Sequence, residues 1–177
     1  MLRLALGVLL VAAVCSGVFV SNLDRACLRC LCEAASGCNE TAGCHQGYCG
    51  PFWVSRIYWA EAGKVVFPDD DPERPEAYQD CANSYDCAAG IVEHYMAAVG
   101  KDCDGDGVTD CDDYAAIHYN GAYSCARPLR GTAFLARYDR CRPTAAPGRL
   151  PPPPPAPQVQ PPLFPGGYLG APAFFAG

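Results

Sequence analysis

Cysteine is the residue that most limits how this chain of 177 residues can fold. Of its thirteen cysteines, twelve lie between residues 27 and 141. An even number of cysteines in an oxidising compartment indicates a disulfide framework, here of six bridges, and a small domain with many turns. Zinc is the weaker alternative, because it needs reduced thiolates and no set of Cys and His residues has zinc-finger spacing.

Short spacings along the chain predict which of these cysteines pair locally. We expect three such bridges, Cys32–Cys38, Cys44–Cys49 and Cys81–Cys87. Each bridge is expected to stabilise the fold by about 2–4 kcal/mol, by restricting the unfolded chain. The sequence leaves open how the other six cysteines pair: Cys27, Cys30, Cys103, Cys111, Cys125 and Cys141.

The start of the chain predicts secretion, and with it the oxidising compartment. Arg3 gives a basic start, residues 4–14 form an uncharged apolar run, and small residues follow at 15–17. This is the pattern of a secretory signal peptide, and the run is short for a membrane span. We therefore expect residues 1–20, including Cys15, to be removed from a secreted protein.

Composition divides the rest of the chain into two parts. Residues 22–142 hold the remaining cysteines and nearly all the charge, and we expect one domain there. Residues 143–177 contain twelve of the seventeen prolines and a single charged residue, Arg149. Such a segment is expected to be extended or disordered. Its proline run at 151–155 could engage a polyproline reader, although a spacer is the favoured interpretation.

The acidic balance of the chain excludes some classes of partner. The formal net charge is −6 at pH 7. Nucleic-acid binding needs a basic surface, so we expect no nucleic-acid partner. Electrostatic adhesion to anionic bacterial envelopes is disfavoured for the same reason. No later apolar run is long enough to span a membrane.

Hydrophobic periodicity predicts a mainly helical fold. We expect helices over residues 27–35, 54–62, 78–83, 86–99, 112–119 and 132–141. Strand is expected only over residues 64–67 and 48–53. The predicted fold class is therefore mainly α (α+β), a small disulfide-rich domain with a minor β-sheet.

Several motifs in a fixed order resemble the invertebrate-type lysozyme (destabilase) family. That family shows C-L-x-C-I-C-x-x-E-S-G-C and then C-G-Y-F-Q-I-K-x-A-Y-W, and the counterparts here run over residues 27–38 and 49–60. A C-x(5)-C pair at residues 81–87 leads into Tyr95-Met96. The segment 115–125, A-A-I-H-Y-N-G-A-Y-S-C, resembles A-x-x-H-x-G-G-x-x-x-C. The resemblance spans the cysteine-bearing domain and excludes the tail.

The resemblance implies a lysozyme-like fold and, in active members, hydrolysis of the β-1,4 bond of peptidoglycan. That reaction needs two carboxylic acids across the scissile bond, one of them an acid with a raised pKa. The family's glutamate corresponds to Ala35, and the family's aspartate falls in the loop between Cys44 and Cys49, which here contains no carboxylate. The sequence therefore predicts impaired hydrolysis.

Three glutamates are conceivable substitutes for the missing acids, namely Glu33, Glu40 and Glu61. Glu33 is two residues from Ala35, which is a rotation of about 200° along a helix, so its side chain is expected to face elsewhere. An active lysozyme with displaced acids is therefore an alternative hypothesis.

The family is also credited with isopeptidase activity, for which a serine and a basic partner are usually proposed. Ser55 and His118 are the conceivable nucleophile and base, while Arg56 stays protonated and cannot act as a base. A helix-start serine and a locally hydrogen-bonded histidine are the favoured interpretations. Candidate glycan contacts are Phe52, Trp53, Tyr58, Trp59 and His118.

Two further motifs suggest modification or metal binding. Residues 102–113 read D-C-D-G-D-G-V-T-D-C-D-D, which has the ligand spacing of a calcium loop with aspartate in the last position. The candidate ligands are Asp102, Asp104, Asp106, Asp110 and Asp113. A solvated acidic turn is the alternative, and no other cofactor is expected. Asn39-Glu40-Thr41 is a glycosylation sequon.

Together these observations predict a secreted lysozyme-like protein that is impaired as a muramidase. It would bind peptidoglycan or related extracellular glycans, in defence or digestion. The alternatives are an active lysozyme with displaced acids and a structural protein that acts through its Pro-rich tail.

Overall fold

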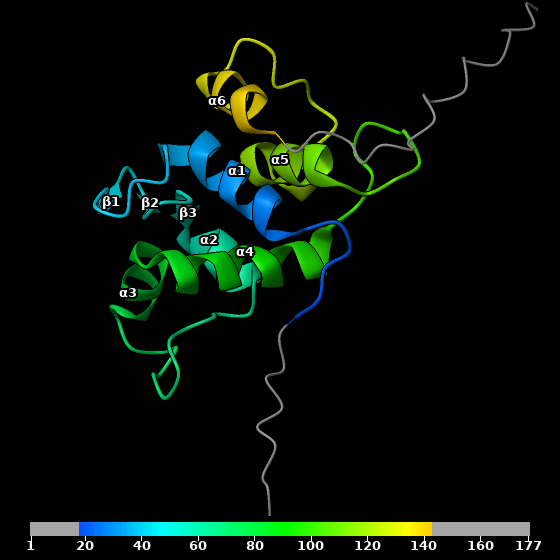
Figure 1. Ribbon diagram of the computed structural model, residues 1–177. Helices are drawn as coiled ribbons and strands as arrows, with labels where there is room; N and C mark the ends of the chain where they lie inside the picture. The colour runs from blue at the N-terminus through cyan, green and yellow to red at the C-terminus, as the bar shows by residue number, and fades with distance from the viewer. Residues whose placement is uncertain (1–17, 143–177) are drawn as a thin grey trace, which may run out of the picture. The chain divides into compact units, whose positions relative to one another are not determined.

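The computed structural model describes residues 18–142 (Figure 1). Most of the predicted signal peptide and the whole of the predicted Pro-rich tail lie outside the described residues. Among the described residues, no helix is both long and apolar enough to cross a membrane.

Helix α1 (Arg25–Ser36) is the centre of the packing, and it begins where the sequence offers a cap. The side chain of Asp24 accepts a hydrogen bond from the backbone N–H of Cys27 at 2.8 Å. Most of the helix is buried, including three of its cysteines, Leu31 and Ala35. Helix α6 (Ala133–Cys141), from the far end of the domain, packs along α1 (Figure 1).

A small antiparallel sheet follows α1. Strands β1 (Cys44–His45), β2 (Tyr48–Cys49) and β3 (Val54–Ser55) lie in the order β1-β2-β3. Tyr48 pairs with both His45 and Ser55. The expected strand over residues 48–53 is therefore confirmed only at its start, because a turn separates β2 from β3.

The expected strand over residues 64–67 is wrong, since these residues form no strand in the structure. Lys64 has a left-handed backbone (φ 58°), which interrupts an extended conformation. The backbone carbonyl of Val65 accepts a hydrogen bond from the indole N–H of Trp59 at 2.6 Å. The segment is thus held by a side chain, and its valines pack on the core instead of pairing in a sheet.

The remaining helices agree with the periodicity within about two residues. They are α2 (Arg56–Glu61), α3 (Ala77–Asn83), α4 (Tyr85–Val99) and α5 (Cys111–Asn120), with a short 3-10 turn η1 (Ala122–Ser124). Helices α2 and α3 contact α4, while α5 contacts α1 (Figure 1). The predicted mainly helical fold with a minor sheet is confirmed.

Six disulfides join these elements. The three local bridges Cys32–Cys38, Cys44–Cys49 and Cys81–Cys87 are confirmed. The pairs that the sequence left open are Cys27–Cys111, Cys30–Cys141 and Cys103–Cys125. Two of these bridges attach α1 to α5 and to α6, so the helix that begins the domain is covalently tied to the elements that end it.

One close approach of the backbone positions the sheet against α3. Gly50 has φ 70°, and a Cβ atom there would lie 1.7 Å from the carbonyl oxygen of Ala82. Only glycine allows the turn after β2 to approach the helix this closely. This turn also sets the position of Trp53, which is 48% exposed and lies outside the core.

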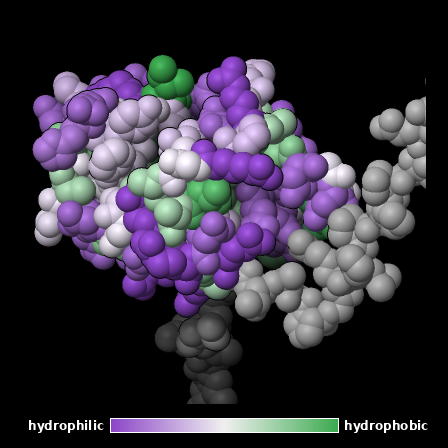
Figure 2. Space-filling model, turned by 90° about the horizontal axis from the view of Figure 1, so that it is seen from above, coloured by the Kyte–Doolittle hydropathy of each residue, from purple (hydrophilic) through white to green (hydrophobic). Residues whose placement is uncertain are grey.

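Figure 2 shows that hydrophilic residues cover most of the face seen from above, with hydrophobic residues exposed in small separate patches. Among the described residues, the large apolar side chains that are exposed include Trp53, Ile57 and Tyr123.

Candidate functional site

A groove with a volume of about 440 Å³ lies where α1, the small sheet, α5 and α6 meet. Its walls come from four places in the chain: the end of α1, the β2–β3 turn, the end of α5 and the start of α6. The residues that line the groove are Ala35, Tyr48, Trp53, His118, Tyr119, Ala133, Phe134 and Arg137.

Ala35, the position expected for the family's glutamate, does line this groove. None of the lining residues carries a carboxylate. Of the substitute acids, Glu33 pairs with Arg29 at 2.9 Å on the outer side of α1. Glu40 and Glu61 are both exposed and do not line the groove either.

Arg137 is the charged residue of the groove, and the sequence analysis missed it. Its Nε donates to the carbonyl oxygen of Ala34 at 2.6 Å, and its Nη2 donates to that of Ala35 at 2.9 Å. The guanidinium therefore caps the carboxyl end of α1, beside Ala35. More than a hundred residues separate Arg137 from these carbonyls. No local sequence pattern could have indicated the contact.

Aromatic rings make up half of the residues that line the groove. Tyr48 and Trp53 are each 48% exposed, and their rings stack with centroids 6.4 Å apart and an angle of 25°. The rings of Tyr119 and Phe134 lie 5.1 Å apart, and Tyr119 is 49% exposed whereas Phe134 is 5% exposed. Tyr48, Tyr119 and Phe134 were missed as candidate glycan contacts, because the sequence does not show which aromatic residues share a surface.

Of the five predicted glycan contacts, only Trp53 and His118 line the groove. Phe52 and Trp59 are wrong as contacts, because they are 0% and 3% exposed and belong to the core. Tyr58 does not line the groove, and its ring stacks on Tyr95 at 3.8 Å.

His118 is held in place by both of its ring nitrogens. Nε2 lies 2.9 Å from the carbonyl oxygen of Phe52, and Nδ1 lies 3.3 Å from the hydroxyl of Tyr58. A carbonyl only accepts, so Nε2 carries the proton and Nδ1 accepts from the hydroxyl. Burial lowers the pKa of His118 to about 4, so the ring is neutral at physiological pH.

Ser55 and His118 are not arranged as a nucleophile and its base. The Ser55 hydroxyl accepts a hydrogen bond from the backbone N–H of Tyr58 at 3.1 Å, and so caps helix α2. Both nitrogens of His118 have other partners. Arg56 donates to the carbonyl of Pro75 at 3.3 Å. The interpretation of Ser55 as a helix-start serine agrees with the structure. His118 is hydrogen-bonded as expected, but its partners Phe52 and Tyr58 are distant in sequence and not local.

The acidic loop (residues 102–113) lies at the other end of α5 from the groove. Asp102, Asp104 and Asp106 converge, with one carboxylate oxygen from each lying within 4.8 Å of the others. Asp113 is buried, and its oxygens accept from the backbone N–H groups of Cys103 at 2.7 Å and Asp110 at 2.8 Å. The structure thus gathers three of the five predicted calcium ligands and uses Asp113 to close the loop.

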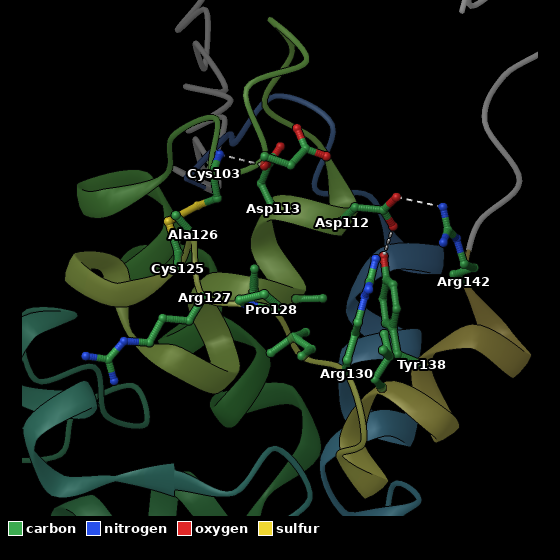
Figure 3. Close-up of a pocket in the computed structure, with 15 residues that line it drawn as sticks. Cys103, Asp112, Asp113, Cys125, Ala126, Arg127, Pro128, Arg130, Tyr138 and Arg142 are labelled. Carbon is green, nitrogen blue, oxygen red and sulfur yellow. Dashed lines mark hydrogen bonds and ion pairs between the residues drawn. A yellow bond between two sulfur atoms is a disulfide. The ribbon is translucent and has the colours of Figure 1, made fainter. Parts of the chain in front are cut away.

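A second cavity of about 290 Å³ lies between the acidic loop, α6 and residues 125–130. The carboxylate of Asp112 accepts from the Tyr138 hydroxyl at 2.8 Å and pairs with Arg142 at 2.7 Å (Figure 3). The contact of Asp113 with Cys103 lies at its edge (Figure 3). Both carboxylates are engaged in holding the structure together, so they do not form a pair of free acids.

The sequon residue Asn39 lies on the surface after α1 and is exposed. Its side-chain oxygen accepts from the backbone N–H and the hydroxyl of Thr41, at 3.0 and 2.8 Å. Glycosylation of Asn39 stays a prediction.

A helical core with six disulfides, a minor sheet and a groove beside the end of α1 defines a small lysozyme-like domain. The chain belongs to the Destabilase family, whose model matches residues 24–141. It is 33% identical over 114 residues to a lysozyme of Magallana gigas, covering 61% of this chain and 73% of that protein. It is 30% identical over 140 residues to a lysozyme of Ostrea edulis, covering 75% and 90%.

A solved structure supports the same fold. The chain is similar to one in the crystal structure of Aeromonas hydrophila PliI in complex with Meretrix lusoria lysozyme. The match has a TM-score of 0.52 and 23% identity, and it covers 70% of this chain and 98% of that chain.

Proposed function

We propose that this protein is a secreted, lysozyme-like glycan-binding protein in which muramidase activity is impaired. Its ligands would be peptidoglycan or related extracellular glycans, and its role would be in defence or digestion. The observation that carries the proposal is the composition of the groove, which is lined by aromatic rings and one cation but no carboxylate.

Impaired hydrolysis follows from the chemistry that the groove lacks. Glycoside hydrolysis needs an acid that protonates the leaving oxygen and a second carboxylate that acts across the sugar ring. The methyl group of Ala35 can do neither. Arg137 cannot replace the acid, because a guanidinium does not give up its proton at physiological pH. Glu33 is engaged by Arg29 on another face of α1.

Glycan binding follows from what the groove retains. A ligand site is typically concave, lined by aromatic side chains and supplied with a few polar groups that fix orientation. Tyr48, Trp53 and Tyr119, which are 48%, 48% and 49% exposed, offer ring surface to the apolar faces of sugar rings. Two further supports are the family membership and the lysozyme relatives.

An extracellular location is supported by the six disulfides, because such bridges persist in oxidising compartments.

The test combines lysis with binding. Purified protein is added to a peptidoglycan suspension between pH 4 and 7.5, turbidity is followed, and the bound protein is measured after sedimentation. We expect binding without clearing. Trp53→Ala should weaken binding about tenfold, as removal of a buried aromatic contact does. Tyr123→Ala is the matched control, since Tyr123 is fully exposed and does not line the groove.

Two outcomes would contradict the proposal. Clear lysis that disappears in Glu33→Gln or Glu40→Gln would mean that displaced acids act. Retention on peptidoglycan that requires residues 143–177 would assign binding to the tail instead of the groove. Ala35→Glu alone should not restore lysis, because the second carboxylate would still be missing.

A further inference from the structure

We propose that the groove selects a sugar that carries a carboxylate, and that Arg137 binds this carboxylate. The inference rests on the proposed function, since it names the class of glycan that the same groove would take. The ligand chemistry is a pyranose chain with a free carboxylate, either a hexuronate or the lactyl group of a muramic acid residue.

The first support is the state of the Arg137 guanidinium. Nε and Nη2 donate to the carbonyls of Ala34 and Ala35, which are neutral groups. Among the described residues, no carboxylate oxygen lies within 4.0 Å of its nitrogens. The side chain lines the groove, so its positive charge is available to a ligand there.

The second support is that the guanidinium is already fixed. A guanidinium has five N–H donors, and the two contacts with α1 use only two of them. The remaining donors include both N–H groups of Nη1. Because α1 holds the plane of the group in place, little side-chain freedom is lost when a carboxylate binds.

The third support is the character of the other groove residues. His118 is neutral, because burial lowers its pKa to about 4, and the methyl side chain of Ala35 adds no further acceptor. Tyr48, Trp53 and Tyr119 add exposed ring surface to the lining of the groove. The groove therefore combines ring surface for a sugar with a single cation, which is the pairing that an acidic sugar needs.

The negative net charge of the chain favours selection by a local cation over general attraction of anions. The formal net charge is −6, so an anion gains little from the surface in general. An acidic glycan that binds does so because of a local cation. Salt should weaken the binding only moderately, since the ion pair forms within a partly enclosed groove.

The experiment compares the binding of a neutral glycan with that of acidic glycans. Isothermal titration calorimetry is carried out with β-1,4-linked N-acetylglucosamine as the neutral probe. The acidic probes are β-1,4-linked glucuronate and glycan strands of peptidoglycan from which the peptides have been removed. We expect the protein to bind an acidic probe at least about tenfold more tightly than the neutral one, as a charge-assisted hydrogen bond allows.

Variants of Arg137 test the assignment. Arg137→Gln should remove the preference for the acidic probe, so that the acidic probe loses much more affinity than the neutral probe does. Arg137→Lys keeps the positive charge and should keep part of the preference for the acidic probe. This variant also tests the assignment if Arg137→Gln fails to fold. The matched control is Arg140→Gln, because Arg140 is exposed on the same helix and does not line the groove.

The outcomes separate this inference from the proposed function. Equal binding of neutral and acidic probes, with no selective loss in either Arg137 variant, would overturn the inference and leave glycan binding intact. No binding of any probe would overturn both. A preference for only one acidic probe would support the inference and identify the source of the carboxylate.

Discussion

The groove and the acidic loop lie at opposite ends of helix α5, and they contain different kinds of side chain. The acidic loop leads into the first turn of α5, which contains Asp112 and Asp113. The last turn of α5 gives His118 and Tyr119 to the groove. The carboxylates gather at one end, while the open, ring-lined surface is at the other.

The helix dipole gives this division a physical basis. The amino end of a helix favours carboxylates, and the carboxyl end favours cations. The groove collects the carboxyl ends of both α1 and α5, so a carboxyl group there would be held in its neutral acid form more readily. That environment suits a general acid, but in this chain Arg137 occupies it. The two regions therefore differ in where their charges lie, with carboxylates at the amino end of α5 and a guanidinium near its carboxyl end.

Removing one disulfide from each region should have the largest effect on the free energy of unfolding. Cys30–Cys141 closes 111 residues and joins the two helices that form the groove, whereas Cys103–Cys125 closes 22 at the acidic loop. Replacing both cysteines of a bridge by alanine is expected to lower the free energy of unfolding by about 5 kcal/mol for Cys30–Cys141 and by about 3 kcal/mol for Cys103–Cys125. The difference arises because a bridge that closes a longer loop restricts the unfolded chain more. Urea unfolding measures both values, and equal costs would contradict the expectation.

A glycine-to-alanine substitution should also lower the stability by different amounts in the two regions. Gly50→Ala forces a Cβ against the carbonyl of Ala82, whereas Gly105 in the acidic loop has a similar positive φ with no atom within 4 Å. We expect Gly50→Ala to cost about 3–5 kcal/mol and to distort the wall that carries Trp53. Gly105→Ala should cost about 1 kcal/mol, from backbone strain alone. Similar melting temperatures for the two variants would show that the turn can move away from α3.

Acidification should destabilise the fold through His118, which lines the groove. The pKa of His118 is lowered to about 4 by burial, while the unfolded chain has the ordinary value near 6.5. As the pH falls, the unfolded state binds this proton first. The contribution of His118 is therefore complete above pH 6.5 and is lost as the pH falls toward 4. The loss is on the order of 3 kcal/mol, at about 1.4 kcal/mol for each pKa unit.

His118→Gln provides the comparison for this pH dependence, since an amide can still donate to the carbonyl of Phe52 but does not titrate. The difference in unfolding free energy between pH 7 and pH 4.5 should be smaller in the variant than in the native protein. An unchanged difference would assign the acid sensitivity to other groups.

Calcium should have the smallest effect, and it should be confined to the acidic loop. If the three converging carboxylates bind calcium as the sequence predicts, 1 mM of the ion should stabilise the fold by about 1 kcal/mol at the affinity typical of extracellular modules. Asp104→Asn should abolish the shift in melting temperature without altering glycan affinity at the groove. A shift that survives in Asp104→Asn would place the ion elsewhere.

Local sequence signals were sufficient for the helices and the short bridges. The period of apolar residues in α4 and the spacing of Cys81 and Cys87 both act within a few residues. They failed at residues 64–67, where two valines suggested a strand. The carbonyl of Val65 is instead bound by the side chain of Trp59, a tertiary contact that strand propensity does not describe.

The sequence by itself determined that this chain is a six-disulfide helical domain and that residue 35 is an alanine. Only the tertiary structure decided that Arg137 lies beside that alanine, and that Trp53 faces the groove while Phe52 is in the core. The reason is physical: helix caps, turns and short loops depend on neighbours in the chain. A groove is made by packing segments far apart in sequence, so its charge and its walls are properties of the assembled fold.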